Sequence, residues 1–245
     1  MTLVLKDVSY IFPNEKKPII SRLNLTVNDG EFVSLIGKSG SGKSTLLKLI
    51  TGLLRENEGE ISHHGNPISL GDVGYMPQRD LLLPWRSIID NILIATEIQK
   101  DHSLSKNIAR EWLERVGLIE YENAFPNQLS GGMRQRVSFL RAMLTGKDLL
   151  LLDEPFGALD AMTKKEMQNW LLSIWKELDK TILFITHDLE EACYLSDRVI
   201  ILQSNQVIED IKVDLPRPRH PDMLHSNKLV TLRRDLEKKI PYAQN

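Results

Sequence analysis

Phe32-Val33-Ser34-Leu35-Ile36-Gly37-Lys38-Ser39-Gly40-Ser41-Gly42-Lys43-Ser44-Thr45 is the stretch on which the interpretation of this 245-residue chain depends. Its first five residues are apolar apart from one serine, which is typical of a buried strand. A glycine-rich loop follows. Residues 44–50 then have the spacing of a helix that Gly52 closes. The chain thus runs from strand to loop to helix, and the loop fits the pattern GxxxxGK[ST].

This loop has the composition of a phosphate-binding site. Its glycines let backbone N–H groups turn inward around phosphate oxygens, and the following helix points its positive end to the same place. Lys43 is placed to neutralise β- and γ-phosphates, and the Ser44 hydroxyl is a suitable ligand for Mg²⁺. The nucleotide contacts that we expect here are Gly37, Lys38, Ser39, Gly40, Ser41, Gly42, Lys43, Ser44 and Thr45.

A second apolar run, Leu149 to Leu152, ends in Asp153 and Glu154. It is too short for a helix and suits a strand buried on both faces. In a parallel sheet the ligand lies beyond the carboxyl ends of the strands, which places both carboxylates beside the phosphate loop. We expect Asp153 to hold Mg²⁺, directly or through water. Glu154 can polarise an attacking water as general base, a role typically worth about 10²–10⁴-fold in rate.

Leu129-Ser130-Gly131-Gly132-Met133-Arg134-Gln135 predicts a second anion site. Ser130 is a good helix N-cap, and the two glycines expose the N–H groups of the first helical turn. The stretch resembles the signature loop of ABC-type ATPases, which has the pattern LSGGQ. Met133 stands in place of the glutamine. This departure affects one side-chain contact, because the anion contacts come from Ser130 and the backbone.

The resemblance to ABC ATPases spans most of the chain, in order and at family-like spacing. It implies that Gln78 touches Mg²⁺ and the attacking water, and that His187 contacts the γ-phosphate and orders Glu154. It also implies an aromatic side chain stacked on adenine. Phe12 falls at the family's position, and Tyr10 is a competing candidate.

By the same resemblance, ATP and Mg²⁺ are the ligands, and two copies of the chain enclose ATP between them. A second helix N-terminus arriving at the γ-phosphate excludes water and stabilises charge. The loop Ala158-Leu159-Asp160 would cross this homodimer interface. The expected catalytic residues are Glu154, His187, Gln78 and Lys43, the metal ligands Ser44, Gln78 and Asp153, and the further nucleotide contacts Phe12, Ser130, Gly131, Gly132 and Asp160.

Strands that alternate with helices after residue 130 favour an α/β fold with a mostly parallel sheet. The resemblance specifies a P-loop NTPase of the ABC type, with a RecA-like core sheet, an antiparallel β subdomain and an inserted helical subdomain. We expect the ATPase domain at 1–215, its helical subdomain at about 85–145, and an accessory tail at 216–245. His63 and His64 adjoin a hairpin turn at Gly65 with no third ligand at metal spacing, so we expect them to be exposed.

Three segments resemble the ATPase subunits of bacterial nitrate, sulfonate and taurine importers. They are Leu83-Pro84-Trp85-Arg86, Pro155-Phe156-Gly157-Ala158 and Leu215-Pro216-Arg217-Pro218-Arg219. Because an aromatic and an arginine are typical interface anchors, the first suits docking on a separate integral-membrane permease. The resemblance implies a peripheral subunit at the cytoplasmic face of the membrane that powers import of a small anionic or sulfur-containing solute. An extracytoplasmic solute-binding protein would be an indirect partner. Nitrate, alkanesulfonates, taurine and pyrimidine precursors are not distinguished.

Composition excludes several other classes of protein. The chain is 42% hydrophobic and 26% charged, which fits an ordinary globular protein rather than a disordered one. No stretch without charged residues approaches the roughly 20 residues of a membrane-spanning helix, and the N-terminus does not resemble a signal peptide. A lone Cys193 suits a reducing compartment. A formal charge of −2 argues against nucleic acid as a partner. A non-transport or regulatory ABC ATPase, acting on a membrane partner or nucleic acid, remains the alternative.

Overall fold

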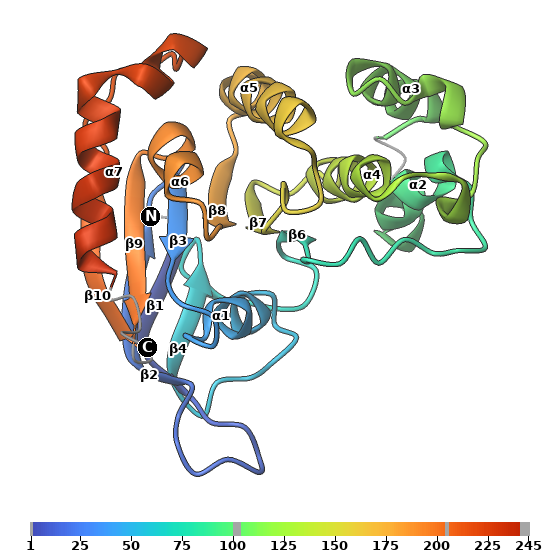
Figure 1. Ribbon diagram of the computed structural model, residues 1–245. Helices are drawn as coiled ribbons and strands as arrows, with labels where there is room; N and C mark the ends of the chain where they lie inside the picture. The colour runs from blue at the N-terminus through green and yellow to red at the C-terminus, as the bar shows by residue number, and fades with distance from the viewer. Residues whose placement is uncertain (1, 100–103, 204–205, 241–245) are drawn as a thin grey trace.

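The chain folds into two sheets with helices around them, seen in a computed structural model that describes residues 2–99, 104–203 and 206–240 (Figure 1). Over these residues the larger sheet has six strands in the order β10-β9-β3-β8-β7-β6. All pair in parallel except β10, which runs antiparallel to β9. The expected α/β core sheet is therefore confirmed. Its strands are β3 (Phe32–Ile36), β6 (Gly74–Met76), β7 (Leu149–Asp153), β8 (Thr181–Ile185), β9 (Arg198–Gln203) and β10 (Gln206–Lys212).

The smaller sheet is antiparallel, with the order β2-β1-β4-β5 in the described part of the chain. Its strands are β1 (Leu3–Tyr10), β2 (Ile20–Val27), β4 (Glu58–His63) and β5 (Asn66–Pro67). The hairpin expected around Gly65 joins β4 to β5. Its second arm is only two residues long, since the chain then crosses to the core sheet, where β6 pairs with β7.

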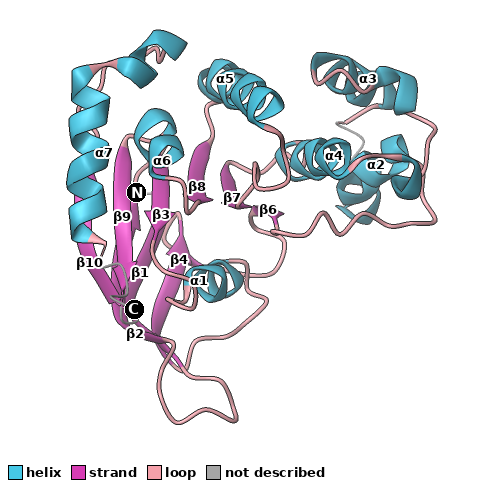
Figure 2. Cartoon of the chain, in the orientation of Figure 1, coloured by secondary structure: helices cyan, strands magenta, loops and turns pink. Residues whose placement is uncertain are grey.

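The helices cover both faces of the core sheet and form a lobe at one side (Figures 1 and 2). The lobe contains α2, α3 and α4, and α4 contacts β6. The helices are α1 (Lys43–Ile50), α2 (Ile88–Gln99), α3 (Lys106–Arg115), α4 (Gly131–Met143), α5 (Ala161–Leu178), α6 (Leu189–Leu195) and α7 (Asn227–Lys239), with short 3₁₀ turns at Ile119–Tyr121, Pro126–Gln128 and Pro221–His225.

Strand β7 shows why the apolar runs are continuous rather than alternating. Leu150 and Leu152 face a core shared with the lobe and α5, whereas Leu149 and Leu151 face a core shared with α1 and the antiparallel sheet. A strand covered on both faces has no side that meets water, so every residue is apolar. The strand thereby delivers Asp153 to the edge of the sheet from within a fully packed layer.

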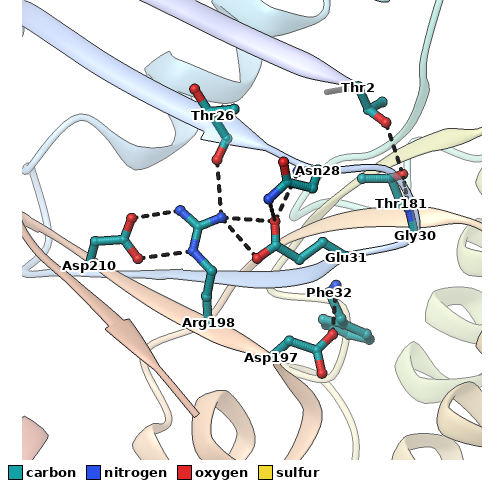
Figure 3. A network of polar contacts seen from close by, with 10 residues as sticks. All are labelled: Thr2, Thr26, Asn28, Gly30, Glu31, Phe32, Thr181, Asp197, Arg198 and Asp210. Atoms are coloured by element: carbon teal, nitrogen blue, oxygen red, sulfur yellow. Dashed lines mark hydrogen bonds and ion pairs between the residues drawn. The ribbon is translucent and has the colours of Figure 1, made fainter.

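A polar network at Arg198 ties the two sheets together (Figure 3). The Arg198 guanidinium donates to both carboxylate oxygens of Glu31, at 2.8 and 2.9 Å, and to the Thr26 carbonyl of β2 at 3.1 Å. It also donates to both oxygens of Asp210 in β10, at 2.6 and 3.0 Å. The hydrogen bonds to Asp210, together with those to Glu31, raise the pKa of Arg198, so its charge is permanent.

The described part of the C-terminal tail packs on the rest of the fold. In α7, Leu229 and Leu236 are fully buried, and the helix lies against α6. Among the described helices, none combines the length and the apolar character needed to cross a bilayer.

Candidate active site

A cavity of about 430 Å³ lies where β3, β6, β7 and β8 reach their carboxyl ends. Parallel strands present these ends at one edge of a sheet, so the segments that follow them meet there although they are far apart in sequence. The cavity is lined by Phe12, Ile19, Gly37, Ser39, Gly40, Gly42, Lys43, Ser44, Thr45, Gln78, Glu154 and His187. Most of the residues singled out in the sequence therefore share one site.

The glycine-rich loop wraps closely around this cavity. Gly42 has φ of 98° and directly precedes α1, and a Cβ atom there would lie 2.8 Å from the Ile19 carbonyl oxygen. A Cβ atom on Gly37 would lie 2.3 Å from the Leu202 carbonyl oxygen. The side chain of Lys43 turns back over the loop, and Nζ donates to the carbonyl oxygens of Gly37 and Lys38 at 2.8 Å each. The ammonium group is thereby fixed at the mouth of the loop.

Lys43 and Asp153 are buried charges of opposite sign. Lys43 is 9% exposed, and burial lowers its pKa, although the negative charges of Glu154 and Asp153 oppose this effect. Asp153 is 4% exposed, and burial raises its pKa, which the neighbouring Glu154 raises further. The Ser44 hydroxyl donates to Asp153 and acts in the opposite direction. A hydroxyl and a carboxylate paired at the loop are the hard oxygen donors that Mg²⁺ prefers.

Glu154 lies at the centre of a polar cluster in which Gln78 and His187 face its carboxylate. Its backbone is left-handed (φ 50°), which turns the side chain out of the direction of β7. Gln78 Nε2 donates to Glu154 Oε2 at 3.1 Å, and His187 Nδ1 lies 3.4 Å from Glu154 Oε1. The three groups come from the ends of β6, β7 and β8. They hold a carboxylate at the cavity wall with polar groups on both oxygens.

The two aromatic candidates for adenine stacking differ in exposure. Phe12 is 38% exposed and lines the cavity, whereas Tyr10 is 7% exposed and belongs to the core of the antiparallel sheet. The rings meet edge to face with centroids 5.0 Å apart. Tyr10 thus supports Phe12 from behind, and Ile19, which the sequence analysis did not select, forms apolar wall beside it.

The signature segment does not line the cavity of its own chain. Ser130 caps α4 by accepting a hydrogen bond from the Met133 N–H at 3.3 Å, which leaves the N–H groups of the first turn at the surface. Asp160 caps α5 through the N–H groups of Met162 and Thr163, both at 3.1 Å. A Cβ atom on Gly132 would lie 3.1 Å from Leu159, so the two segments adjoin.

Gln135 is a positioning residue that sequence reasoning missed. It is 5% exposed in α4, and its Nε2 donates to the Glu154 carbonyl oxygen at 3.0 Å. Its Oε1 accepts from the Ala158 N–H at 2.8 Å. One buried amide therefore joins the signature helix to the turn after β7. The only sequence signal was a glutamine on the apolar side of a helix.

Helix α4 also holds the loop after Gln78. Arg134 Nε donates to Asp80 at 2.9 Å, and the Arg141 guanidinium donates to the carbonyl oxygens of Asp80 and Leu81 at 2.6 and 2.8 Å. These arginines lie on a helix that does not contribute to the nucleotide cavity. Their function in the fold is to fix a loop.

The expectation of exposure was right for His64, whose side chain is 48% exposed, and wrong for His63. His63 has a side chain that is only 12% exposed, and Asp148, from the segment before β7, lies beside both imidazoles. Asp148 lies 84 residues after His64 in the sequence, so the spacing of residues could not predict that they meet.

Comparison with known proteins is consistent with this geometry. The profile of the family described as "ABC transporter" matches residues 20–157. The formylaminopyrimidine import ATP-binding protein ThiZ of Halalkalibacterium halodurans is 44% identical over 97% of this chain and 94% of its own length. The nitrate import ATP-binding protein NrtD of Synechococcus elongatus is 42% identical over 86% of this chain and 81% of its own. The aliphatic sulfonates import ATP-binding protein SsuB of Zymomonas mobilis is 45% identical over 83% of this chain and 84% of its own length.

Two solved structures of similar shape are described as dimers. An ATP-binding cassette described as a dimeric post-hydrolysis state bound to ADP and Pi matches with a TM-score of 0.78 and 29% identity. A dimeric bacterial transporter cassette matches with a TM-score of 0.77 and 30% identity. Each alignment covers 87% of this chain and all of the other.

Proposed function

Because this chain belongs to the ABC transporter family, as an ATP-binding import subunit that hydrolyses ATP, we propose that it powers uptake of a small anionic or sulfur-containing solute. The names of its relatives include nitrate and aliphatic sulfonates, which are solutes of this class, and also formylaminopyrimidine and bicarbonate. The observation that carries the proposal is the cavity in which the phosphate loop, Gln78, Glu154 and His187 meet.

In the proposed reaction, ATP lies with its adenine on Phe12 and its phosphates in the loop. The Lys43 ammonium would exchange the carbonyls it now contacts for β- and γ-phosphate oxygens, which are stronger, charged acceptors. Glu154 then accepts a proton from water as the water attacks the γ-phosphorus, and the bond between that phosphorus and the β–γ bridging oxygen breaks, which releases ADP and phosphate. Gln78 orients that water, and His187 keeps the carboxylate aligned.

Ser44, Asp153 and Gln78 are the residues that would hold Mg²⁺. The fit rests on the buried carboxylate of Asp153, whose pKa is raised by burial and which a cation at this place would stabilise in its charged form. When bound, Mg²⁺ neutralises negative charge that develops on the phosphates. The chain's own contribution is to keep these oxygen donors together at the end of β7.

We further propose that two copies enclose ATP, with Ser130, Gly131 and Gly132 of one copy facing the γ-phosphate in the other. The exposed N-terminus of α4 supports this arrangement, because its unpaired N–H groups attract an anion. The solved relatives that form dimers support it as well. Asp160, adjoining Gly132 through Leu159, would then lie at the contact between copies.

Docking on an integral-membrane permease at the cytoplasmic face of the membrane would use the loop of Trp85. That side chain is 72% exposed, and Leu81 in the same loop is 60% exposed. Large apolar side chains clustered at the surface are typical of protein interfaces, and tryptophan is a frequent anchor there. The outward-facing solute-binding protein would meet the permease and not this chain.

The dimer is tested by replacing Glu154 with glutamine, which keeps the side chain's size but removes the base. With Mg²⁺ and ATP, E154Q should have a mass in solution near twice 28.0 kDa, while the double variant K43A/E154Q stays monomeric. A monomeric E154Q, even with the permease present, would refute the ATP-enclosing dimer.

The solute and partner need separate experiments. A strain that lacks this subunit is offered labelled nitrate, alkanesulfonates and taurine, and uptake of the transported solute should be lost. Expression of the wild-type subunit should restore that uptake, and expression of K43A should not. Purification from membranes should recover a polytopic permease. Recovery with ribosomes or DNA instead would favour the non-transport alternative.

A further inference from the structure

His63, His64 and Asp148 form a cluster at the end of the sheet opposite the nucleotide cavity. His63 ends β4, and His64 begins the turn to β5. Asp148 directly precedes β7, whose other end carries Asp153. Five residues of strand separate the two ends, a distance of roughly 17 Å at 3.3 Å per residue. The cluster is therefore independent of the active site.

The backbone of the turn brings the two imidazoles together. Adjacent residues of a regular strand point to opposite faces, so a His-His pair within a strand would diverge. His64 instead has φ of 49°, in the left-handed region. The two rings consequently lie on the same side, with centroids 4.5 Å apart and planes tilted by 41°.

Asp148 completes a set of three donor atoms. His63 Nε2 lies 3.4 Å from Asp148 Oδ1, and His64 Nε2 lies 2.5 Å from Oδ2. The three donor atoms all lie within 4.8 Å of one another. Ligands held about 2.0–2.2 Å from one tetrahedral metal ion are separated by about 3.3 Å. The His63 contact to Oδ1 already has this value. The His64 contact is to the other oxygen, Oδ2, at hydrogen-bond distance, so coordination through one oxygen requires the His64 side chain to move away from Asp148.

Two further features distinguish the cluster from an ordinary surface ion pair. His63 Nε2 is buried and has no hydrogen-bond partner in the described part of the structure. The second nitrogen of His64, Nδ1, faces Asp29, whose Oδ1 lies 3.8 Å away. At this distance the pair is a charge contact and not a hydrogen bond, so Asp29 favours positive charge at the cluster without fixing the tautomer of His64.

We propose that His63, His64 and Asp148 form a binding site for a divalent transition-metal ion, Zn²⁺ by preference, with water as the fourth ligand. Two imidazole nitrogens and one carboxylate oxygen are the donor set of zinc, whereas Mg²⁺ and Ca²⁺ require oxygen. The ion would tie the β4–β5 turn of the antiparallel sheet to the start of β7 in the core sheet.

The test is titration of the untagged, chelator-treated chain with Co²⁺ and Zn²⁺ in excess Mg²⁺. The wild type should bind one Co²⁺ per chain, with a visible absorption band typical of nitrogen ligands, and Zn²⁺ should displace it. H63A and D148N should lose this band and bind at least tenfold more weakly. Asp29→Asn, which removes only a more distant negative charge, should weaken binding less than H63A or D148N.

His225→Ala is the matched control, since this exposed histidine lies outside the cluster and its loss should change nothing. Circular dichroism and retained ATP binding show that each variant is folded, because the ATP site lies at the other end of β7. Absence of stoichiometric binding by the wild type would overturn the proposal, as would equal affinity in D148N. Either result would leave His64 and Asp148 as a simple hydrogen-bonded pair.

Discussion

Replacing Asn91 with leucine should release the loop that carries Trp85. Asn91 lies in α2 and is fully buried. Its Oδ1 accepts a hydrogen bond from the Leu83 N–H at 2.7 Å. Its Nδ2 lies 3.0–3.1 Å from three carbonyl oxygens, those of Leu83, Arg86 and Ser87. One amide thus holds both ends of the turn from which Trp85 projects.

The expected loss of stability in N91L depends on which backbone groups lose a hydrogen-bond partner. Leucine has the branched shape of asparagine and a larger volume, so no cavity opens. The carbonyls of Ser87 and Leu83 keep backbone hydrogen bonds, from Asn91 N at 2.9 Å and Arg86 N at 3.1 Å. The Leu83 N–H and the Arg86 carbonyl have no such substitute. At about 1–3 kcal/mol for each group left unpaired, we expect the free energy of unfolding to fall by about 2–6 kcal/mol.

Urea denaturation followed by circular dichroism measures this loss. Asn123→Leu is the control, because that exposed amide makes a single hydrogen bond, to Glu122, and its removal should cost under about 0.5 kcal/mol. N91L should also bind the permease more weakly while its ATP affinity stays unchanged. Equal midpoints for N91L and N123L would refute the reasoning.

Three other substitutions test the site and its support. Gln135→Leu should lower kcat for ATP hydrolysis by about 10–100-fold and change ATP affinity by less than about twofold, because this residue positions the base but does not line the cavity. Steady-state kinetics measures kcat, and nucleotide titration measures the affinity. Lys164→Met leaves the Glu191 carboxylate, 2.6 Å from Nζ, buried without a cation and should lower the free energy of unfolding at pH 7 by about 3–5 kcal/mol. Burial raises the pKa of Glu191, so the folded state takes up a proton more readily than the unfolded state as the pH falls. A protonated Glu191 needs no cation, so K164M should lower the free energy of unfolding by less at pH 5 than at pH 7. Phe12→Ala should weaken ATP binding about tenfold in a fluorescence titration, whereas Tyr10→Phe should not.

Local chemistry made the phosphate loop and the strand before Asp153 predictable. Gly40 and Gly42 have φ of 78° and 98°, which a local glycine pattern predicts. The close approach of Leu202 to Gly37 and of Ile19 to Gly42 comes from distant segments and could not be predicted in this way. The apolar run Leu149–Leu152 indicates that both faces of its strand are covered, but it does not indicate which elements cover them. Resemblance supplied the rest of the active site, including Gln78 and His187, whose residue types carry no such information.

Contacts that depend on tertiary approach could not be predicted in this way. The pairing of Gln135 with Glu154 requires knowing how α4 lies against the end of β7. The meeting of His64 with Asp148 requires knowing which strands of two different sheets end side by side. Sequence spacing describes neighbours along one element, and each of these pairs spans two.

Helix α4 connects the features that the proposed function needs. Its first residue follows Ser130, and Gln135 lies one and a half turns further and holds the backbone of Glu154. Arg141, near its other end, holds the loop that begins after Gln78. Coupling between distant sites requires a contiguous element that both can bias, and this helix makes direct hydrogen bonds to each. A permease that moves the loop of Trp85 must therefore either shift α4, and with it Ser130 and the base, or break the hydrogen bonds of Arg141.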